Sequence, residues 1–551
     1  MDNIQQAEKN ERTVRQRDYA DLIPAIVIVT LCAVMFLSGT FLRDAWGPDE
    51  ARYAEVAREM VDSGNYILPH LNFQVYADKP PLIFWLMALS ASILGGFSTF
   101  AIVLPSALAG ACTVVLIYFL ANDMFQNRRA AFLSCLVLAT SVQFFHVSQF
   151  GRIDMLLCFF ETLAVYAFWL WYTRGQRRFL GVFYVAMAFA ILAKGPVGLL
   201  PIPVAIAFLI WSGQKSLIRR MALVPGLLAV AAIVACWFLP AAAAGGKPYW
   251  QEILGLQIVG RLHNSWSHSE PFYFYIENFP ADALPWFVLI PAALVRYVKD
   301  ATVRDRLFMK FIVAWFLTIF VVFSLISGKR NVYLLPLYPA FALFVGYYLD
   351  YAISAGKPKV RELKLYLGLL FTAAVGAGIA LAVLPAVTDI PVRPALCFAG
   401  SAVLAVTGLF GLIALRAKTF RPAMVAVGCL LVIVLAGDTV ALSISNKRES
   451  AKPLGLAIHA ARQDAEPVAV FGGYRAEYSF HVGLPIEQLA TDKELRQFMA
   501  QPTGAFCIAK KDALDKLDQP LAESIETLGA FTVGSRNLVL LYDPPDSETA
   551  Q

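Results

Sequence analysis

Long apolar stretches separated by short basic loops dominate this chain of 551 residues. A helix needs about 20 mainly apolar residues to cross the hydrocarbon core of a bilayer. Hydrophobic residues make up 58% of the chain, compared with about 45–50% in soluble domains. We therefore predict a polytopic α-helical membrane protein with about 13 transmembrane helices. The predicted spans are residues 22–42, 100–121, 130–149, 155–173, 179–193, 196–212, 220–241, 282–298, 308–326, 333–353, 364–386, 394–415 and 422–442.

One shorter apolar run, residues 81–95, is better explained as a helix that lies in the membrane interface. It follows Pro80 and Pro81 and has only about 15 residues, which is short for a span. If this run does not cross the membrane, the N-terminal tail and the basic loops all fall on the same side. The excess of Lys and Arg in cytoplasmic loops then assigns that side to the cytoplasm.

The predicted topology divides the chain into three parts. Residues 1–21 form a cytoplasmic N-terminal tail, and residues 22–445 form the transmembrane domain. Residues 446–551 form a small α/β domain on the outer side, because short buried-type strands alternate there with helical stretches. The outer loops of the transmembrane domain are residues 43–99, 150–154, 242–281 and 327–332. The expected strands of the outer domain are Val468–Phe471, Ala505–Ala509 and Leu538–Tyr542, and its expected helices are Asp492–Met499 and Lys511–Leu517.

The first outer loop carries charged and aromatic residues with helical spacing. Pro48, Asp49 and Glu50 resemble a helix start, with the acids in the first turn. Asp49, Arg52 and Tyr53 then lie within about one turn and face the same way. A carboxylate, a guanidinium and a phenol beside a membrane suit a sugar phosphate, although an ordinary amphipathic helix would show the same local pattern.

Two more pairs of charged residues stand at the outer ends of helices. Asp78 and Lys79 directly precede the double proline of the interfacial helix, and Arg152 and Asp154 lie at the start of a span. Because a charge at the edge of the hydrocarbon is costly, we interpret these residues as functional. The alternatives are a solvated turn for the first pair and a helix N-cap for Asp154.

Several cations fall on the outer side, against the general tendency of short loops. They are Lys79, Arg152, Lys194, Arg261, Lys329 and Arg330. Snorkelling explains some residues of this kind, but the group as a whole indicates an anion-binding surface, with phosphate as the obvious ligand. Lys329 and Arg330, which stand close to Tyr333 and Tyr338, are the best candidates for binding a lipid phosphate.

Two of the six histidines, His263 and His268, lie in the long outer loop 242–281. A histidine and a carboxylate could share a divalent cation, zinc or another, but two ligands do not define a site. No local motif indicates a Ser/His/Asp or Cys/His nucleophile, a metalloprotease or a nucleotide-binding loop. These classes of enzyme are therefore disfavoured, and no nucleic-acid partner is expected.

Five motifs follow one another along residues 20–345. They are Pro48-Asp-Glu-x-Arg-Tyr-Ala-Glu-x-Ala-Arg-Glu-Met60, Asp78-Lys-Pro-Pro81, Gly151-Arg-x-Asp154, His268-x-x-Pro-Phe-Tyr273 and Lys329-Arg-x-x-Tyr-Leu-Leu-Pro-Leu-Tyr-Pro339. This series resembles the motifs of the bacterial aminoarabinose transferases of lipid A, which are relatives of the protein O-mannosyltransferases within the GT-C glycosyltransferases. The number of spans and the outer domain also resemble that family.

The resemblance implies the GT-C fold and an inverting displacement at the anomeric carbon of a lipid-linked sugar. The implied donor is 4-amino-4-deoxy-L-arabinose on undecaprenyl phosphate, and the implied acceptor is a phosphate of lipid A in the bacterial inner membrane. Asp49 would be the principal catalytic carboxylate and Asp154 the second. On the matched positions, Arg52, Tyr53, Lys79 and Tyr338 would hold the donor or acceptor phosphates. The full set of predicted substrate-binding residues is Glu50, Arg52, Tyr53, Lys79, Arg152, Lys329, Arg330, Tyr333 and Tyr338.

The second motif departs from the family at one position. The family carries a glutamate where this chain has Asp78, and that glutamate is associated with a divalent ion beside the loop histidine, here His268. Aspartate is one methylene shorter than glutamate. This departure bears on the metal site, for which Asp78 and His268 are the implied ligands.

Other functions are compatible with parts of this pattern. An enzyme of the same fold and donor class could move another sugar, such as galactosamine or galacturonic acid, or use another acceptor, because the motifs do not encode the sugar. A flippase or transporter of the lipid-linked sugar would predict internal repeats or charges near mid-membrane, and neither is evident in the sequence. A protein mannosyltransferase would carry a different outer domain.

Overall fold

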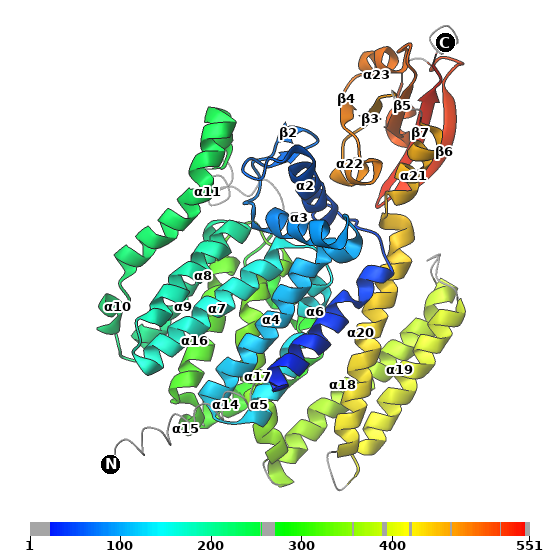
Figure 1. Cartoon of the computed structure of the whole chain (residues 1–551). Coiled ribbons are helices and arrows are strands. Elements are labelled where there is room, and N and C mark those ends of the chain that lie inside the picture. Colours follow the sequence, from blue (N-terminus) through cyan, green and yellow to red (C-terminus); the bar gives the residue numbers. More distant parts are fainter. Residues whose placement is uncertain are drawn as a thin grey trace.

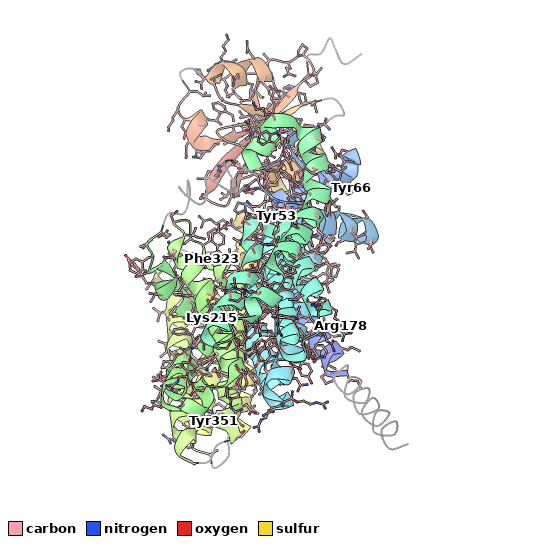
Figure 2. The ribbon with its side chains drawn as sticks, turned by 90° about the vertical axis from the view of Figure 1, so that its left-hand side faces the viewer. Tyr53, Tyr66, Arg178, Lys215, Phe323 and Tyr351 are labelled. Atoms are coloured by element: carbon pink, nitrogen blue, oxygen red, sulfur yellow. The ribbon has the colours of Figure 1, made fainter. Side chains whose placement is uncertain are left out.

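A computed structural model describes residues 23–253, 255, 270–354, 357–387, 394–417, 421–462, 466–517 and 520–545. It is a bundle of long helices with a small sheet domain at one end (Figure 1). Tyr53 lies near that domain, whereas Tyr351 lies at the opposite end of the bundle (Figure 2). The predicted tail, residues 1–21, falls outside the described residues.

The first half of the chain forms one part of the helical bundle and includes the loop region that contains α2, β1, β2 and α3. A helix over Ile23–Phe41, whose last turn is the 3₁₀ helix η1 (Ser38–Phe41), opens the described chain. It is followed by α2 (Glu50–Ser63), the hairpin β1 (His70–Leu71) and β2 (Gln74–Val75), α3 (Leu82–Leu94), α4 (Thr99–Phe125), α5 (Arg128–Ala139), α6 (Val142–Ser148), α7 (Ile153–Arg174), α8 (Arg178–Lys194), η2 (Pro196–Leu199), α9 (Pro201–Trp211), α10 (Leu217–Arg220) and α11 (Leu223–Gln251).

The second half completes the bundle and leads into the sheet domain. Its helices are α13 (Phe274–Asp282), η4 (Trp286–Leu289), α14 (Ile290–Lys299), α15 (Ala301–Arg304), α16 (Leu307–Leu325), η5 (Asn331–Leu337), α17 (Tyr338–Ser354), α18 (Lys357–Val387), α19 (Pro394–Ala414) and α20 (Arg421–Glu449). In Figure 1 α20 runs upward from the bundle into the sheet domain.

In the described parts of the chain, nine helices are long and apolar enough to cross a membrane, or eleven if each of two bent pairs counts as one span. The bent pairs are α5 with α6, at 66°, and α13 with the helix Trp286–Lys299, at 106°. The remaining two predicted spans correspond to α8, which has 17 residues, and to the short apolar helix Pro196–Trp211. The predicted helical bundle is confirmed, and the count of 13 spans is not.

The helix α3 has 13 residues, which is too short to cross a bilayer and fits the predicted interfacial helix. It begins after Pro81 and ends at Gly95, whose φ of 79° is left-handed and therefore favours glycine. The predicted span 282–298 differs from the structure, because the chain bends after Asp282 and the next helix begins at Trp286.

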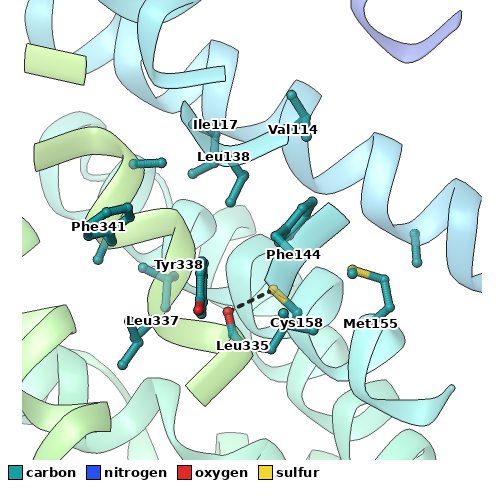
Figure 3. Packing of buried hydrophobic residues seen from close by; sticks show 14 of the residues in the cluster. Val114, Ile117, Leu138, Phe144, Met155, Cys158, Leu335, Leu337, Tyr338 and Phe341 are labelled. Atoms are coloured by element: carbon teal, nitrogen blue, oxygen red, sulfur yellow. Dashed lines mark hydrogen bonds between the residues drawn. The ribbon is translucent and has the colours of Figure 1, made fainter. Parts of the chain in front are cut away.

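Apolar side chains fill the interior of the bundle. Figure 3 shows the packing where α7 meets η5, with Cys158 donating to the backbone oxygen of Leu335 at 3.5 Å. Aromatic rings fill the space between α7, α9 and α16, where Phe208 and Phe311 have ring centroids 5.1 Å apart. These apolar contacts hold α7, η5, α9 and α16 together.

The sheet domain is a mixed five-stranded sheet with strand order β4-β3-β5-β7-β6. Strand β3 is parallel to β4 and β5, and β7 is antiparallel to β5 and β6. Its elements are α21 (Lys452–Ala461), β3 (Val468–Phe471), α22 (Ala476–Val482), β4 (Ile486–Leu489), α23 (Asp492–Met499), β5 (Ala505–Lys510), α24 (Lys511–Leu514), β6 (Glu526–Val533) and β7 (Arg536–Asp543).

The three predicted strands are present, and the two edge strands β4 and β6 were not predicted. The helix α20 extends to Glu449, so the sheet domain begins slightly later than the predicted boundary at residue 446. The central strands β3 and β5 are buried on both faces, whereas most side chains of β6 are exposed or half-buried. An exposed edge strand lacks the continuous apolar run that identifies a buried strand.

Candidate active site

Three segments that are distant in the sequence meet at the end of the bundle nearest the sheet domain. Asp49 immediately precedes α2, Asp154 lies in the first turn of α7, and Arg330 precedes η5. Both terminal nitrogens of Arg330 lie 3.3 Å from Oδ2 of Asp49. Arg330 also interacts electrostatically with Asp154. Residues predicted from three separate motifs therefore share one site.

We call this group the charged cluster. It consists of Arg52, Lys79, Arg152, Lys194, Arg330, Asp49, Asp78 and Asp154. Five cations thus face three carboxylates, which leaves an excess of positive charge. An excess of guanidinium and ammonium groups is suited to binding phosphate anions.

The Asp49 carboxylate is largely shielded from solvent, with 13% of its side chain exposed. Burial opposes ionisation, but the positive charges of Arg152, Arg330, Arg52 and Lys79 outweigh it and hold the pKa of Asp49 below the usual aspartate value of 3.8. Asp49 is therefore an anion at neutral pH.

Asp154 is paired with Lys194, which reaches it from the C-terminal end of α8. Lys194 donates a short hydrogen bond to the Asp154 carboxylate, and its ammonium lies 4.3 Å from the centroid of the Tyr333 ring. Only 6% of Asp154 is exposed. The N-cap residue of α7 is Arg152, so the alternative explanation of Asp154 as an N-cap does not hold.

The second motif adds a smaller network at the edge of the charged cluster. The Asp78 carboxylate lies 3.0 Å from the Lys79 ammonium and 3.6 Å from Arg52. It also accepts a hydrogen bond from the Tyr76 hydroxyl at 3.2 Å. Lys79 and Arg52 keep 13% and 29% of their side chains exposed, so Arg52 is the more accessible of the two cations.

Tyr53 interacts electrostatically with both catalytic candidates, Asp49 and Asp154. Its side chain is buried, with its ring centroid 5.8 Å from that of Phe84 on α3. Burial and the nearby charge of Asp49 raise the pKa of Tyr53, and Asp154 acts in the same direction. The phenol therefore stays protonated and can donate a hydrogen bond within the cluster.

The structure places Glu50 away from the charged cluster, although it was predicted to bind substrate. Both oxygens of its carboxylate accept from Arg43, at 2.5 and 2.8 Å, and one accepts from the backbone N–H of Gly151 at 2.8 Å. Arg43 also donates to the backbone oxygen of Gln149. The two side chains are almost fully buried. Glu50 thus joins the first outer loop to the loop before α7, and we correct its predicted role from substrate contact to positioning.

Lys329 and Tyr338 also lie outside the cluster. The Lys329 ammonium is buried and donates to the backbone oxygens of Ile326 and Glu270 at 2.6 and 2.8 Å. Tyr338 lies in the apolar core, 1% exposed, beside Leu337 and Phe341 (Figure 3). Neither is placed to bind a phosphate in the cluster, so this part of the prediction is corrected.

The proposed metal ligands are only partly described. His268, together with Arg261 and His263, lies outside the described residues. Within the described residues, no group of three or more His, Cys, Asp or Glu side chains could hold a metal ion. The Asp78 carboxylate faces Lys79 and Arg52, a surrounding that fits an ion pair better than a metal ligand. A divalent cation at this position stays a prediction.

Sequence reasoning did not identify some residues that shape the site. Lys194 was recognised as an outer cation, but nothing in the sequence revealed its partner Asp154. Glu161 lies about two turns further along α7. It is buried beside the charge of Lys194, and neither of its carboxylate oxygens has a hydrogen-bond partner in the described part of the chain. An acid inside an apolar span was the available signal.

The family of the chain follows from its relatives. Residues 78–239 match a family model described as dolichyl-phosphate-mannose-protein mannosyltransferase. Over 380 residues the chain is 31% identical to the undecaprenyl phosphate-alpha-4-amino-4-deoxy-L-arabinose arabinosyl transferase 2 of Proteus mirabilis, covering 68% of this chain and 67% of that protein. The chain belongs to this arabinosyl transferase family. It is therefore a membrane glycosyltransferase of the polyprenyl-phosphate-sugar-dependent kind.

Other arabinosyl transferases are similar over the same extent. The enzyme of Pectobacterium atrosepticum is 26% identical over 368 residues, which cover 65% of each chain. The matched region thus spans about two thirds of the length of these relatives.

The fold agrees with that of a solved arabinosyl transferase. The crystal structure of ArnT from Cupriavidus metallidurans bound to undecaprenyl phosphate superposes with a TM-score of 0.76, over 94% of this chain and 97% of that one. The sequence identity is 20%, so this likeness concerns the fold. The archaeal oligosaccharyltransferase AglB of Archaeoglobus fulgidus is more distant, with a TM-score of 0.51 and 12% identity.

Proposed function

We propose that this transferase moves 4-amino-4-deoxy-L-arabinose from undecaprenyl phosphate to a phosphate of lipid A, at the periplasmic face of the bacterial inner membrane. The names of its relatives support the donor and the sugar. The observation that carries the proposal is the charged cluster, in which an ionised Asp49 lies among cations suited to phosphate. The N-terminus would be cytoplasmic, and the sheet domain periplasmic.

The reaction would proceed by displacement at the anomeric carbon. The bond from this carbon to the undecaprenyl phosphate oxygen breaks, and a bond to an oxygen of the acceptor forms on the opposite face. Undecaprenyl phosphate leaves as an anion, and the positive charges of Lys79 and Arg52 would stabilise it. Arg330 and Arg152 would reduce the repulsion between the two phosphates.

Asp49 would act on the acceptor. A lipid A phosphate arrives largely ionised and needs little help from a base, so positioning would provide most of the acceleration. With an alcohol acceptor, Asp49 would instead accept the proton of the hydroxyl as a general base. Asp154, held by Lys194, would be the second carboxylate beside the sugar.

The ionisation of Asp49 should depend on Arg330. A carboxylate with a depressed pKa keeps its function at neutral pH and loses it as the pH falls through that pKa. Arg330→Gln removes a charge that lowers the pKa of Asp49. We therefore expect the acid limb of kcat/KM, which lies below the usual aspartate value of 3.8 in the native protein, to move to higher pH in this variant, measured from about pH 3 to pH 6. Arg330→Lys keeps the charge and should leave the limb near its native position, and an identical profile for Arg330→Gln would contradict the prediction.

Mass spectrometry of lipid A from cells with and without this chain tests the proposal directly. The expected difference is one aminopentose on a phosphate. A hexosamine or a hexuronic acid in its place would support the same fold acting on galactosamine or galacturonic acid. No difference at all would overturn the proposal.

A flippase would change the lipids of the cell without transferring sugar itself. Incubation of the purified protein in detergent with the lipid-linked sugar and lipid A separates the two functions. A transferase gives labelled lipid A, whereas a flippase gives none.

A further inference from the structure

The sheet domain holds residues 43–80, the part of the first outer loop that precedes α3, at several separate points. In Figure 1 the helix α2 and the β1–β2 hairpin lie directly beside this domain. The first outer loop contributes Asp49, Arg52, Asp78 and Lys79 to the charged cluster. Any movement of the loop relative to the bundle would therefore displace half of the cluster.

The strongest contact is made by the side chain of Asn72. Its amide nitrogen donates to the backbone oxygen of Ile486 at 2.7 Å, and its amide oxygen accepts from the backbone N–H of Ile486 at 2.9 Å. Ile486 begins β4, which is an edge strand of the sheet. The Asn72 side chain thus pairs with this edge as a neighbouring strand would, and both groups are buried.

The position of Asn72 is itself fixed by α2. Asn72 and Phe73 form the turn of the β1–β2 hairpin, with φ values of 54° and 61°. A two-residue hairpin turn with two positive φ values is of type I′, for which asparagine is well suited. The carboxylate of Glu59 on α2 accepts from the backbone N–H groups of both turn residues, at 2.6 and 3.0 Å. The hairpin turn therefore connects α2 to the sheet.

A second set of contacts lies at the other end of the loop, just before Asp49. His481 on α22 lies 2.8 Å from the backbone oxygen of Ala45, and burial lowers the pKa of His481, which favours the neutral ring. Asp44 accepts hydrogen bonds from Asn446 at 3.1 Å and from Ser450 at 2.8 Å. The sheet domain and α20, the helix that leads into it, thus contact the loop both before and after α2.

We propose that the sheet domain is a clamp that holds the first outer loop in its working geometry, and that Asn72 is the principal positioning residue. This inference rests on the proposed role of Asp49 and Lys79 in sugar transfer. Asn72 does not contact the charged cluster, so it acts through Glu59 and α2. Because a misplacement of about 1 Å can cost about a hundredfold in rate, a loosened loop would lose turnover even when the fold is intact.

The test compares Asn72→Gly with Thr491→Ala in the full-length protein. Glycine keeps the positive φ of the turn and removes only the side chain that pairs with Ile486. Thr491 caps α23 inside the sheet domain and has no part in the clamp, so its removal perturbs the domain without touching the loop. We measure kcat and KM with the lipid-linked sugar, and backbone amide exchange by hydrogen–deuterium mass spectrometry.

We expect Asn72→Gly to lower kcat by about tenfold or more and to speed amide exchange in residues 43–60 and at the start of β4. Thr491→Ala should leave kcat unchanged, and it should also leave amide exchange unchanged in residues 43–60 and at the start of β4. His481→Ala, which removes a contact at the other end of the loop, should change both in the same direction as Asn72→Gly. It provides a second test if Asn72→Gly does not fold.

Any one of three results would contradict the proposal that the sheet domain clamps the loop. They are native kcat in Asn72→Gly, unchanged exchange in residues 43–60, or an equal loss of activity in Thr491→Ala. If the native protein transferred no sugar, the proposed function would fail by itself, and the exchange data would still decide whether the sheet domain restrains the loop.

Discussion

Asp49→Asn is expected to lower kcat by about a hundredfold, because Asp49 holds Arg330 and would position the acceptor, and a misplacement of about 1 Å costs about that factor. The KM for the lipid-linked sugar should change little, since Arg52 and Lys79 remain in place to bind the donor phosphate. Asparagine has nearly the same shape as aspartate, so the variant removes the charge and leaves the packing at the start of α2. Initial rates with purified enzyme, the lipid-linked sugar and lipid A provide the measurement.

A matched control lies on the same helix. Asp62 is 57% exposed, and its carboxylate lies 3.1 Å from the Arg58 guanidinium. Asp62→Asn makes the same chemical change far from the charged cluster and should leave kcat within about twofold of native. If Asp49→Asn retained a tenth or more of the native kcat, Asp49 would not be the principal catalytic carboxylate.

The largest loss of stability is expected for Arg43→Ala. Arg43 and Glu50 have almost no exposed surface, and the arginine fills the space over the Phe150 ring, 4.3 Å from its centroid. Removing one partner of a buried ion pair leaves the other charge uncompensated, which costs about 3–5 kcal/mol. The protein can be unfolded in detergent with heat or denaturant. The free energy of unfolding of the variant should be lower than that of the native protein by this amount.

Two comparisons make this prediction specific. Arg43→Ala combined with Glu50→Gln leaves no unpaired charge and should recover part of the loss. Lys452→Ala breaks an ion pair with Asp44 whose lysine is 54% exposed, and it should cost about 1 kcal/mol or less. If Arg43→Ala and Lys452→Ala lowered the free energy of unfolding equally, the burial of the Arg43–Glu50 pair would add nothing to the cost of breaking it.

Hydropathy was sufficient to predict most of the helical bundle, and the charged motifs predicted most of the segments that form the charged cluster. The spacing of Asp49, Arg52 and Tyr53 predicted one shared helix face, because helical periodicity is a local property. The bend within the predicted span 130–149, between α5 and α6, could not be predicted in the same way. The apolar composition of this span is that of a continuous helix, and only packing against neighbouring helices decides where the chain turns.

The partners of charged residues were the least predictable part of the site. Glu50 and Asp49 are adjacent in the sequence and equally acidic, yet one pairs with a buried arginine and the other faces the charged cluster. Lys329 and Arg330 differ in the same manner, since the lysine binds backbone oxygens and the arginine binds Asp49. Which neighbour turns inward depends on contacts with distant loops, and a single sequence does not contain that information.

The buried pair of Arg43 and Glu50 also means that the active site is arranged before the substrates bind. It joins the segment before Asp49 to the segment before Asp154, so the spacing of the two carboxylates is settled when the protein folds. The conformational entropy lost in bringing the two carboxylates together is therefore lost during folding, and it is not lost again in each catalytic cycle. Each incoming pair of lipids then encounters a preorganised centre, and binding energy remains available to align the sugar with its acceptor.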